Sequence, residues 1–217
     1  MSDNVDNFRN TVFRVMLRMR IWPGMEDEFE QVWHEVGSAI AKNPANVTQW
    51  LCRSETDAVY YIISDWVGES EFREFETSDR HREFRQMLQP YRASGSMTTM
   101  QITMQLPGAA SAATQSPRDG GVRALVYYAT QDSTSIEEGY HKVSRELAGV
   151  PGLCGNELLH SVHDPTRFIV LSRWSELAAF QQWESGSSHR NGAAPMRRFE
   201  DTRLDRPFGL YRVEAEH

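Results

Sequence analysis

Residues 66–84 read WVGESEFREFETSDRHREF, and residues 174–192 read WSELAAFQQWESGSSHRNG. At a constant offset of 108 residues the two stretches share a leading Trp, a Phe six positions later, an aromatic residue followed by Glu, and a His-Arg pair. The same offset aligns further pairs on either side: Tyr60 with Phe168, Ser64 with Ser172, and Tyr91 with Phe199. Internal similarity at a fixed offset indicates duplication of a structural unit.

Between the two copies lies a segment, residues 107–121, that is rich in Gly, Ala, Ser and Pro and lacks large apolar residues. This composition is typical of a flexible linker. The sequence therefore predicts a disordered N-terminus over 1–10, a first module over 11–106, the linker over 107–121 and a second module over 122–217.

The first module begins with a strand, because Phe13, Val15, Leu17 and Met19 alternate with mostly basic neighbours. Apolar residues then recur at helical spacing up to about residue 40. Further patterns predict strands over 47–53 and 59–66, a helical region from about residue 72 to 88 that can be broken, and a strand over 96–105.

The second module repeats this order more loosely, with strands predicted over 123–129, 153–161, 167–174 and 207–214 and helical segments over 135–148, 176–184 and 188–200. The order β-α-β-β-α-β is that of an α+β, ferredoxin-like fold. Such a sheet carries helices on one face and leaves the other bare, so two modules in one chain can bury their bare faces against each other. We therefore expect an intrachain pseudo-dimer in the form of an α/β barrel, either monomeric or as a homodimer of the pseudo-dimer.

The composition argues against several classes of protein. A net charge of −7 over 217 residues argues against nucleic-acid binding, which needs a basic face. No apolar run approaches the roughly 20 residues needed to cross a membrane, and the polar start of the chain does not resemble a signal peptide. With two cysteines no disulfide scaffold is expected. These features predict a cytoplasmic protein.

The module order and the strand-end Trp followed by helical aromatics resemble the antibiotic biosynthesis monooxygenase family of dimeric α/β barrels. The similarity is greater to its tandem form from aromatic polyketide pathways, which has a pattern like Trp174-Ser175, Phe180, Trp183-Glu184-Ser185 and His189-Arg190. The resemblance covers both modules.

This resemblance implies a monooxygenase that oxidises an aromatic polyketide, an anthrone or phenol, to a quinone in antibiotic or pigment biosynthesis. Molecular oxygen would be the co-substrate, with no flavin, haem or metal cofactor. Two alternatives stay open: a polyketide cyclase of the same fold, and a non-catalytic accessory protein of a biosynthetic complex. Haem degradation is a more distant possibility, since no suitable axial His is evident.

The resemblance also implies a pocket between sheet and helices of each module, near Trp66 and Trp174. Either Trp can stack on the substrate and donate its indole N–H, or simply pack in the core. The substrate-binding residues expected around them are Phe72, Phe180, Trp183, Ser172, His189 and Arg190. The His-Arg pairs can equally cap a helix end. Some family members carry an Asn four residues before the Trp, but here Ile62 and Val170 occupy those positions.

His160 is the candidate general base, because an imidazole with a pKa near 6.5 can accept a phenolic proton near neutral pH. At the 108-residue offset its counterpart is Cys52, which suits that role poorly. We therefore expect His160 to face Trp174, the second pocket to be the active one, and His160→Ala to reduce turnover by about a hundredfold. The seven histidines show no metal-binding spacing.

Overall fold

The computed structural model describes residues 12–110, 121–186 and 194–217. Both modules follow the predicted order of elements. The first comprises β1 (Phe13–Ile21), α1 (Glu26–Ile40), β2 (Asn46–Ser54), β3 (Val59–Trp66), α2 (Glu69–Thr77), α3 (Asp79–Leu88), the 3-10 turn η1 (Gln89–Tyr91) and β4 (Arg92–Pro107). The second comprises β5 (Val122–Ala129), α4 (Ser133–Leu147), β6 (Leu153–Ser161), β7 (Arg167–Trp174), α5 (Leu177–Ser185), α7 (Ala194–Arg197) and β8 (Phe208–Glu216).

The predicted second helical region of the first module is indeed broken, at Ser78. The backbone of Ser78 is extended, and its side-chain oxygen accepts a hydrogen bond from the backbone N–H of His81, as an N-cap does. One helix thus ends and the next begins at this residue.

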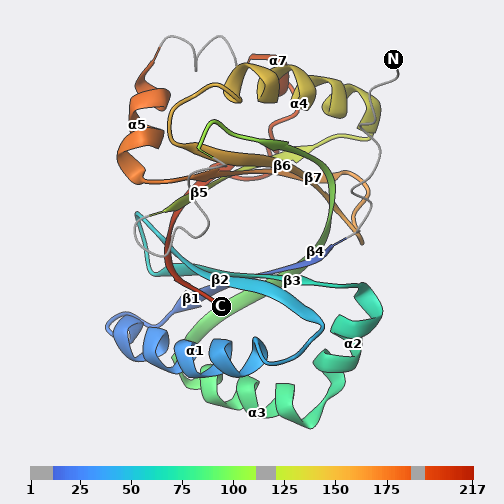
Figure 1. The fold of residues 1–217 in the computed structure, drawn as a ribbon. Helices are drawn as coiled ribbons and strands as arrows, with labels where there is room; N and C mark the ends of the chain where they lie inside the picture. The colour runs from blue at the N-terminus through green and yellow to red at the C-terminus, as the bar shows by residue number, and fades with distance from the viewer. Residues whose placement is uncertain (1–11, 111–120, 187–193) are drawn as a thin grey trace.

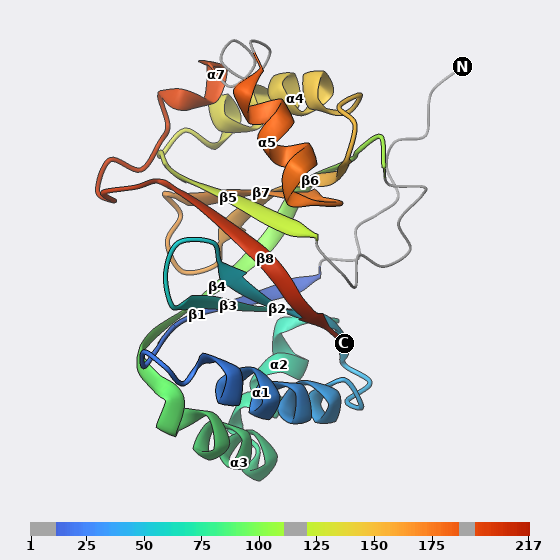
Figure 2. The same ribbon diagram turned by 90° about the vertical axis from the view of Figure 1, so that its left-hand side faces the viewer.

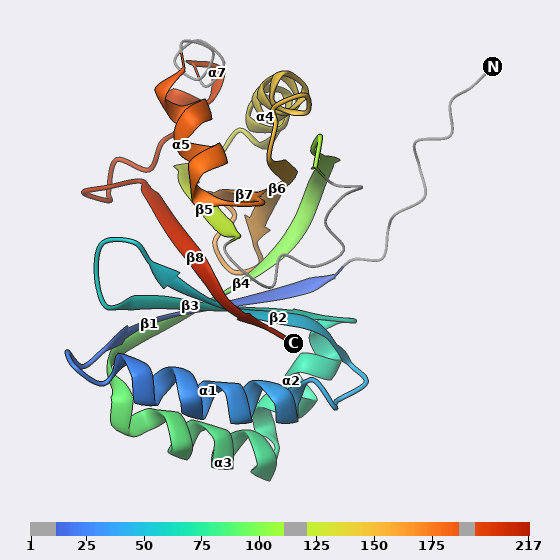
Figure 3. The same ribbon diagram turned by 60° about the vertical axis from the view of Figure 1, so that its left-hand side comes forward.

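The eight strands form one closed barrel in the order β1-β3-β2-β8-β5-β7-β6-β4. Within each module the pairing is that of a ferredoxin-like sheet, and the two sheets join along two seams. The last strand of each module pairs antiparallel with the second strand of the other, β8 with β2 and β4 with β6. Figure 1 shows the two sheets facing each other with helices on the outside, and Figures 2 and 3 show β8 running from the upper sheet to the lower one. The predicted fold of two ferredoxin-like modules in an intrachain barrel is confirmed.

Alternation along each strand sends one set of side chains to the helices and the other into the barrel interior. On β3, Tyr60 belongs to the core beneath α1 and α3, whereas Tyr61 and Ile63 belong to the interior core. On β7, Phe168 belongs to the core beneath α4, and Ile169 and Leu171 lie inside the barrel. The molecule therefore has a shared interior and two separate helix-covered faces.

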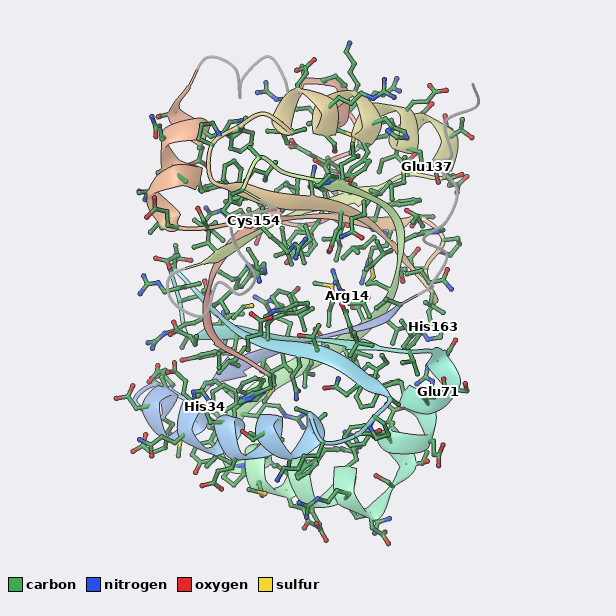
Figure 4. The ribbon with its side chains drawn as sticks, viewed as in Figure 1. Arg14, His34, Glu71, Glu137, Cys154 and His163 are labelled. Atoms are coloured by element: carbon green, nitrogen blue, oxygen red, sulfur yellow. The ribbon has the colours of Figure 1, made fainter. Side chains whose placement is uncertain are left out.

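A buried ion cluster connects the modules inside the barrel. Arg14 on β1 donates two hydrogen bonds to Asp65, from Nε at 2.7 Å and from Nη2 at 2.8 Å, and its Nη1 donates to Glu157 on β6. All three side chains are at most 8% exposed, and Arg14 lies between the two sheets in Figure 4. Arg173 lies beside Glu157 at 3.9 Å. The guanidinium of Arg14 thus pairs with a carboxylate from each module.

These partners outweigh the cost of burial for the ionised forms. Burial alone would raise the pKa of Glu157, but the guanidinium groups of Arg14 and Arg173 lower it below its usual 4.5. Burial would likewise lower the pKa of Arg14, yet Glu157 and Asp65 raise it. Both groups stay charged at neutral pH.

Removal of Arg14 should be strongly destabilising, because it leaves two buried carboxylates without compensation. We expect Arg14→Met to lower the free energy of unfolding by about 3–5 kcal/mol in urea denaturation. Arg80→Met is the matched control: Arg80 pairs with Glu83, but the two side chains are 64% and 59% exposed, so its loss should change stability by less than about 0.5 kcal/mol. Equal effects of the two substitutions would contradict this account.

Acid should weaken the fold through Glu157. A carboxyl whose pKa is lower in the folded than in the unfolded chain stabilises the fold above its unfolded pKa, and that contribution is lost as the pH falls through the folded value. The free energy of unfolding should therefore decrease below about pH 4.5, the ordinary value for Glu. Denaturation curves at several pH values should show a shallower decrease in Glu157→Gln.

Candidate functional site

The helix-covered face of the first module is filled by its own side chains. Phe29 and Trp33 of α1 and Phe84 of α3 pack on Tyr60, and each of the four is at most 5% exposed. The hydroxyl of Tyr60 donates to Glu30 at 2.6 Å. Large aromatic side chains thus occupy the volume directly beneath α1 and α3. A pocket of about 440 Å³ does lie among α1, α2 and α3 of this module, but no strand residue lines it.

The corresponding face of the second module contains a cavity of about 360 Å³ between β5, β6, β7 and the helices α4, α5 and α7. Its lining is mainly apolar and aromatic, with a few polar groups, as is usual for small-molecule sites. The lining residues are Ala124, Val126, Tyr128, Tyr140, Val143, Ser144, Leu147, Asn156, Val170, Ser172, Phe180, Trp183, Glu184, Met196, Arg197, Glu200, Pro207 and Phe208.

Asn156 is the most distinctive polar group of this cavity. It is 2% exposed, and its Nδ2 donates to Ser144 Oγ at 2.8 Å. Its Oδ1 is buried and has no hydrogen-bond partner among the described residues. An unsatisfied buried group of this kind costs about 1–3 kcal/mol, which a ligand can recover by bonding to it. Because the two ends of an amide are interchangeable by a flip, Asn156 can offer a ligand either an acceptor or a donor.

The first module has Gln49 in the equivalent place. Gln49 lies opposite Ser64 on the neighbouring strand, as Asn156 lies opposite Ser172. The longer side chain of Gln49 reaches the carbonyl of Gly37 and donates to it at 2.7 Å. The equivalent amide is therefore tied to a helix in one module and faces a cavity in the other.

Two tyrosines contribute to the wall near Asn156. Tyr140 donates its hydroxyl to the backbone carbonyl of Asn156 at 2.7 Å, which fixes α4 on β6. Tyr128 lines the cavity, and its hydroxyl makes no hydrogen bond to the described part of the chain. Burial raises the pKa of both phenols, so both stay neutral near pH 7 and act as donors.

Among the predicted residues, Phe180, Trp183 and Ser172 line the cavity. Trp174 lies behind them: it is fully buried, packs against Phe180 and Trp183, and donates its indole N–H to Ser172 Oγ at 3.0 Å.

Trp66 makes the same bond to Ser64 at 3.0 Å, and Phe72 packs on Trp66 in the first module. The two tryptophans are thus equivalent core residues whose N–H groups are already satisfied. His189 and Arg190 lie outside the described residues.

The predicted juxtaposition of His160 with Trp174 is wrong. His160 lies opposite Phe168, and Trp174 lies opposite Leu153, at the other end of the β6–β7 hairpin. Six residues of strand separate the two positions, about 20 Å. His160 stacks on Phe168 with ring centroids 4.2 Å apart, and its Nε2 lies 3.0 Å from the carbonyl oxygen of Pro165. It does not line the cavity.

The predicted equivalence of His160 and Cys52 is wrong as well, because the offset between modules is not constant. Ile62 and Val170 are equivalent at 108, but their partners on β2 and β6, Leu51 and Leu158, differ by 107. The residue equivalent to His160 is therefore Arg53. Cys52 lies in the barrel interior, where burial raises the pKa of its thiol to about 12.

A sequence profile described as antibiotic biosynthesis monooxygenase matches residues 12–87 and again residues 128–195. The chain belongs to this family. Among curated proteins it is similar to Protein SchA of Streptomyces halstedii, with 25% identity over 97 residues, 44% of this chain and 26% of that protein. The match thus spans about a quarter of the length of that relative.

Among solved structures the chain resembles an anthrone oxidase-like protein, with a TM-score of 0.74, 12% identity and coverage of 96% of this chain and 94% of the other. It also resembles a candidate monooxygenase from Fusobacterium nucleatum subsp. nucleatum, with a TM-score of 0.75, 6% identity and coverage of 97% and 95%. At these identities the likeness establishes the shared tandem fold. In the described residues, no helix is long and apolar enough to cross a membrane, and no group of three His, Cys, Asp or Glu side chains could hold a metal ion.

The two equivalent amides give a matched test of which face is built for a ligand. Gln49→Leu removes a satisfied bond and should lower the free energy of unfolding by about 1 kcal/mol. Asn156→Leu also removes an unpartnered buried oxygen, so its loss in stability should be smaller or absent. Urea denaturation of both variants measures the difference. A larger decrease in the free energy of unfolding for Asn156→Leu than for Gln49→Leu would mean that Asn156 serves the stability of the fold and not a ligand.

Proposed function

We propose that this chain is a cofactor-independent monooxygenase that oxidises an aromatic polyketide, an anthrone-like or phenolic intermediate, to a quinone in the cavity of the second module. Membership of the monooxygenase family supports the reaction class. The resemblance to an anthrone oxidase-like protein supports the kind of substrate. The observation that carries the proposal is the aromatic-walled cavity on the sheet of the second module, into which Asn156 brings an amide oxygen without a partner among the described residues; in the first module aromatic side chains cover the equivalent part of the sheet.

The cavity suits a flat, hydroxylated aromatic molecule. Phe180, Trp183 and Phe208 supply ring faces and edges, and the aliphatic side chains of the strands supply the opposite wall. A phenolic hydroxyl of the substrate can donate to Asn156 Oδ1. Alternatively, after an amide flip, the substrate's carbonyl can accept from Nδ2.

For an anthrone, the reaction balances with oxygen alone. The ring methylene is oxidised to a carbonyl: one oxygen atom of O2 enters the new C=O bond, and the other leaves as water with the two methylene hydrogens. Removal of one methylene proton gives an electron-rich enolate, which is itself the reductant of O2. No flavin, haem or metal is required by this balance.

The role of the protein is then to stabilise the enolate and to exclude water. Donors placed at the developing oxyanion in a buried site stabilise it far more than they would in water. After the amide flip, in which Oδ1 takes the place next to Ser144, the Nδ2 of Asn156 and the neutral hydroxyl of Tyr128 are the donors proposed for the oxyanion. Two carboxylates line the cavity, Glu184 and Glu200, and either can accept the methylene proton; Glu200 also pairs through its backbone with Tyr128.

The proposal predicts oxygen consumption with 1,8-dihydroxyanthrone as the probe. The purified protein should raise O2 uptake and formation of the corresponding quinone above the spontaneous rate, with one O2 consumed per quinone. An oxygen electrode and the visible absorption of the quinone measure both quantities. No protein-dependent uptake would contradict the oxygenase assignment, and cyclisation of a poly-β-ketone without oxygen uptake would favour the cyclase.

Variants then locate the reaction. Asn156→Leu should reduce turnover by about a hundredfold, since loss of one oxyanion donor typically has an effect of that size. The Gln49→Leu variant, with the matched change in the first module, should have the same turnover as the unchanged protein. His160→Ala should also be close to normal, because His160 lies at the far end of the hairpin. A hundredfold loss in His160→Ala with a normal Asn156→Leu would place the reaction elsewhere.

A further inference from the structure

A second cavity, of about 600 Å³, opens at one end of the barrel interior. It is distinct from the cavity of the second module and shares only Phe180, Glu184 and Phe208 with it. Strands of both modules contribute to its wall. Its lining residues are Met16, Arg18, Ser54, Glu55, Thr56, Asp57, Tyr61, Ser96, Thr98, Tyr127, Arg167, Ile169, Phe180, Glu184, Asp201, Leu204, Arg206, Phe208, Gly209, Leu210 and Tyr211.

Three tyrosines from different strands meet in this cavity. The hydroxyls of Tyr61 on β3 and Tyr127 on β5 lie 3.0 Å apart and share a hydrogen bond. The rings of Tyr61 and Tyr211 stand edge to face with centroids 5.0 Å apart. The single hydrogen bond between Tyr61 and Tyr127 uses one of their two phenolic protons, so the other proton of this pair is left for an acceptor in the cavity.

These phenols are donors at neutral pH. Burial raises the pKa of Tyr61 to about 12 and raises that of Tyr127 well above 10. The pKa of Tyr211 is raised too, chiefly by burial, although the positive charge of Arg18 opposes the shift. Within a hydrogen-bonded pair of neutral phenols, each hydroxyl polarises the other, which strengthens donation from the free proton to an acceptor.

At this end of the barrel, which we call its mouth, the arginines without an ion pair among the described residues outnumber the carboxylates without one. Three of the lining carboxylates are held by arginines outside the cavity: Asp201 by Arg203, Glu55 by Arg212 and Asp57 by Arg20. The lining arginines are less engaged. Among the described residues Arg18 and Arg206 form no ion pair, and Arg167 lies 3.8 Å from Asp164. The remaining lining carboxylate, Glu184, lies at the boundary with the other cavity.

We propose that this mouth of the barrel is a second binding site, for an aromatic carboxylate. The carboxylate accepts hydrogen bonds from the guanidinium of Arg18 and from the free proton of the Tyr61–Tyr127 pair, and the ring packs on Met16, Ile169 and the tyrosine rings. The proposal does not depend on the oxygenase reaction, because it uses neither Asn156 nor the cavity around it.

The test uses 2-naphthoate as the probe and the intact chain. Isothermal titration should show binding that weakens as salt is raised, and 2-naphthalenemethanol, which lacks the charge, should bind at least about tenfold more weakly. Arg18→Met should raise the Kd by about tenfold, and Tyr127→Phe, which keeps the ring, should raise it severalfold. Arg18 is exposed, so its loss should not prevent folding.

Matched controls separate this site from the other cavity and from surface charge. Asn156→Leu and Arg80→Met should bind 2-naphthoate as the unchanged protein does. Absence of binding at millimolar probe would overturn the proposal. Binding that is lost in Asn156→Leu and kept in Arg18→Met would overturn it too, because it would place the probe in the second module. Failure of the oxygen-uptake experiment leaves these outcomes unaffected.

Discussion

The pairing of sheet edges between the modules is the constraint on which the rest of the structure depends. An open sheet exposes unpaired N–H and C=O groups along both edges. Here β4 is paired with β6 and β8 with β2, so each module closes both edges of the other. Closure turns two bare sheet faces into one interior and directs every helix outwards (Figure 1). It thereby separates the molecule into an enclosed lumen and two outer faces that can change independently.

The ion cluster around Arg14 gives this closure a fixed register. A buried guanidinium that pairs with Asp65 on one sheet and Glu157 on the other is satisfied in only one alignment of the two modules. A slip of one residue would turn these groups towards the helices and leave charges buried without partners. On β1, Arg14 belongs to this cluster, whereas Arg18, four residues further on, lines the tyrosine-rich cavity.

The sequence predicts the fold well because the duplication repeats whole elements, and each element has its own apolar period. The same constant offset misplaces His160, because turns of different length shift the register between elements. Leu17 and Val126 are equivalent at 109, Ile62 and Val170 at 108, and Leu51 and Leu158 at 107. Asn156 has no motif around it. The available signal is that Asn156 and Glu157 are adjacent polar residues in the middle of a strand, so one faces the helices and the other the lumen.

Duplication also explains how one face can carry an unpartnered polar group. A cavity and an unsatisfied amide both reduce stability, and a small isolated module has little stability to lose. In the tandem barrel the first module keeps the aromatic core of Trp33, Phe29 and Phe84, and its Gln49 is fully engaged with α1. Because the two modules share a lumen and two seams, that core stabilises the second module as well. The second face is then free to exchange packing for a binding site, and such exchange of stability for function is common in natural proteins.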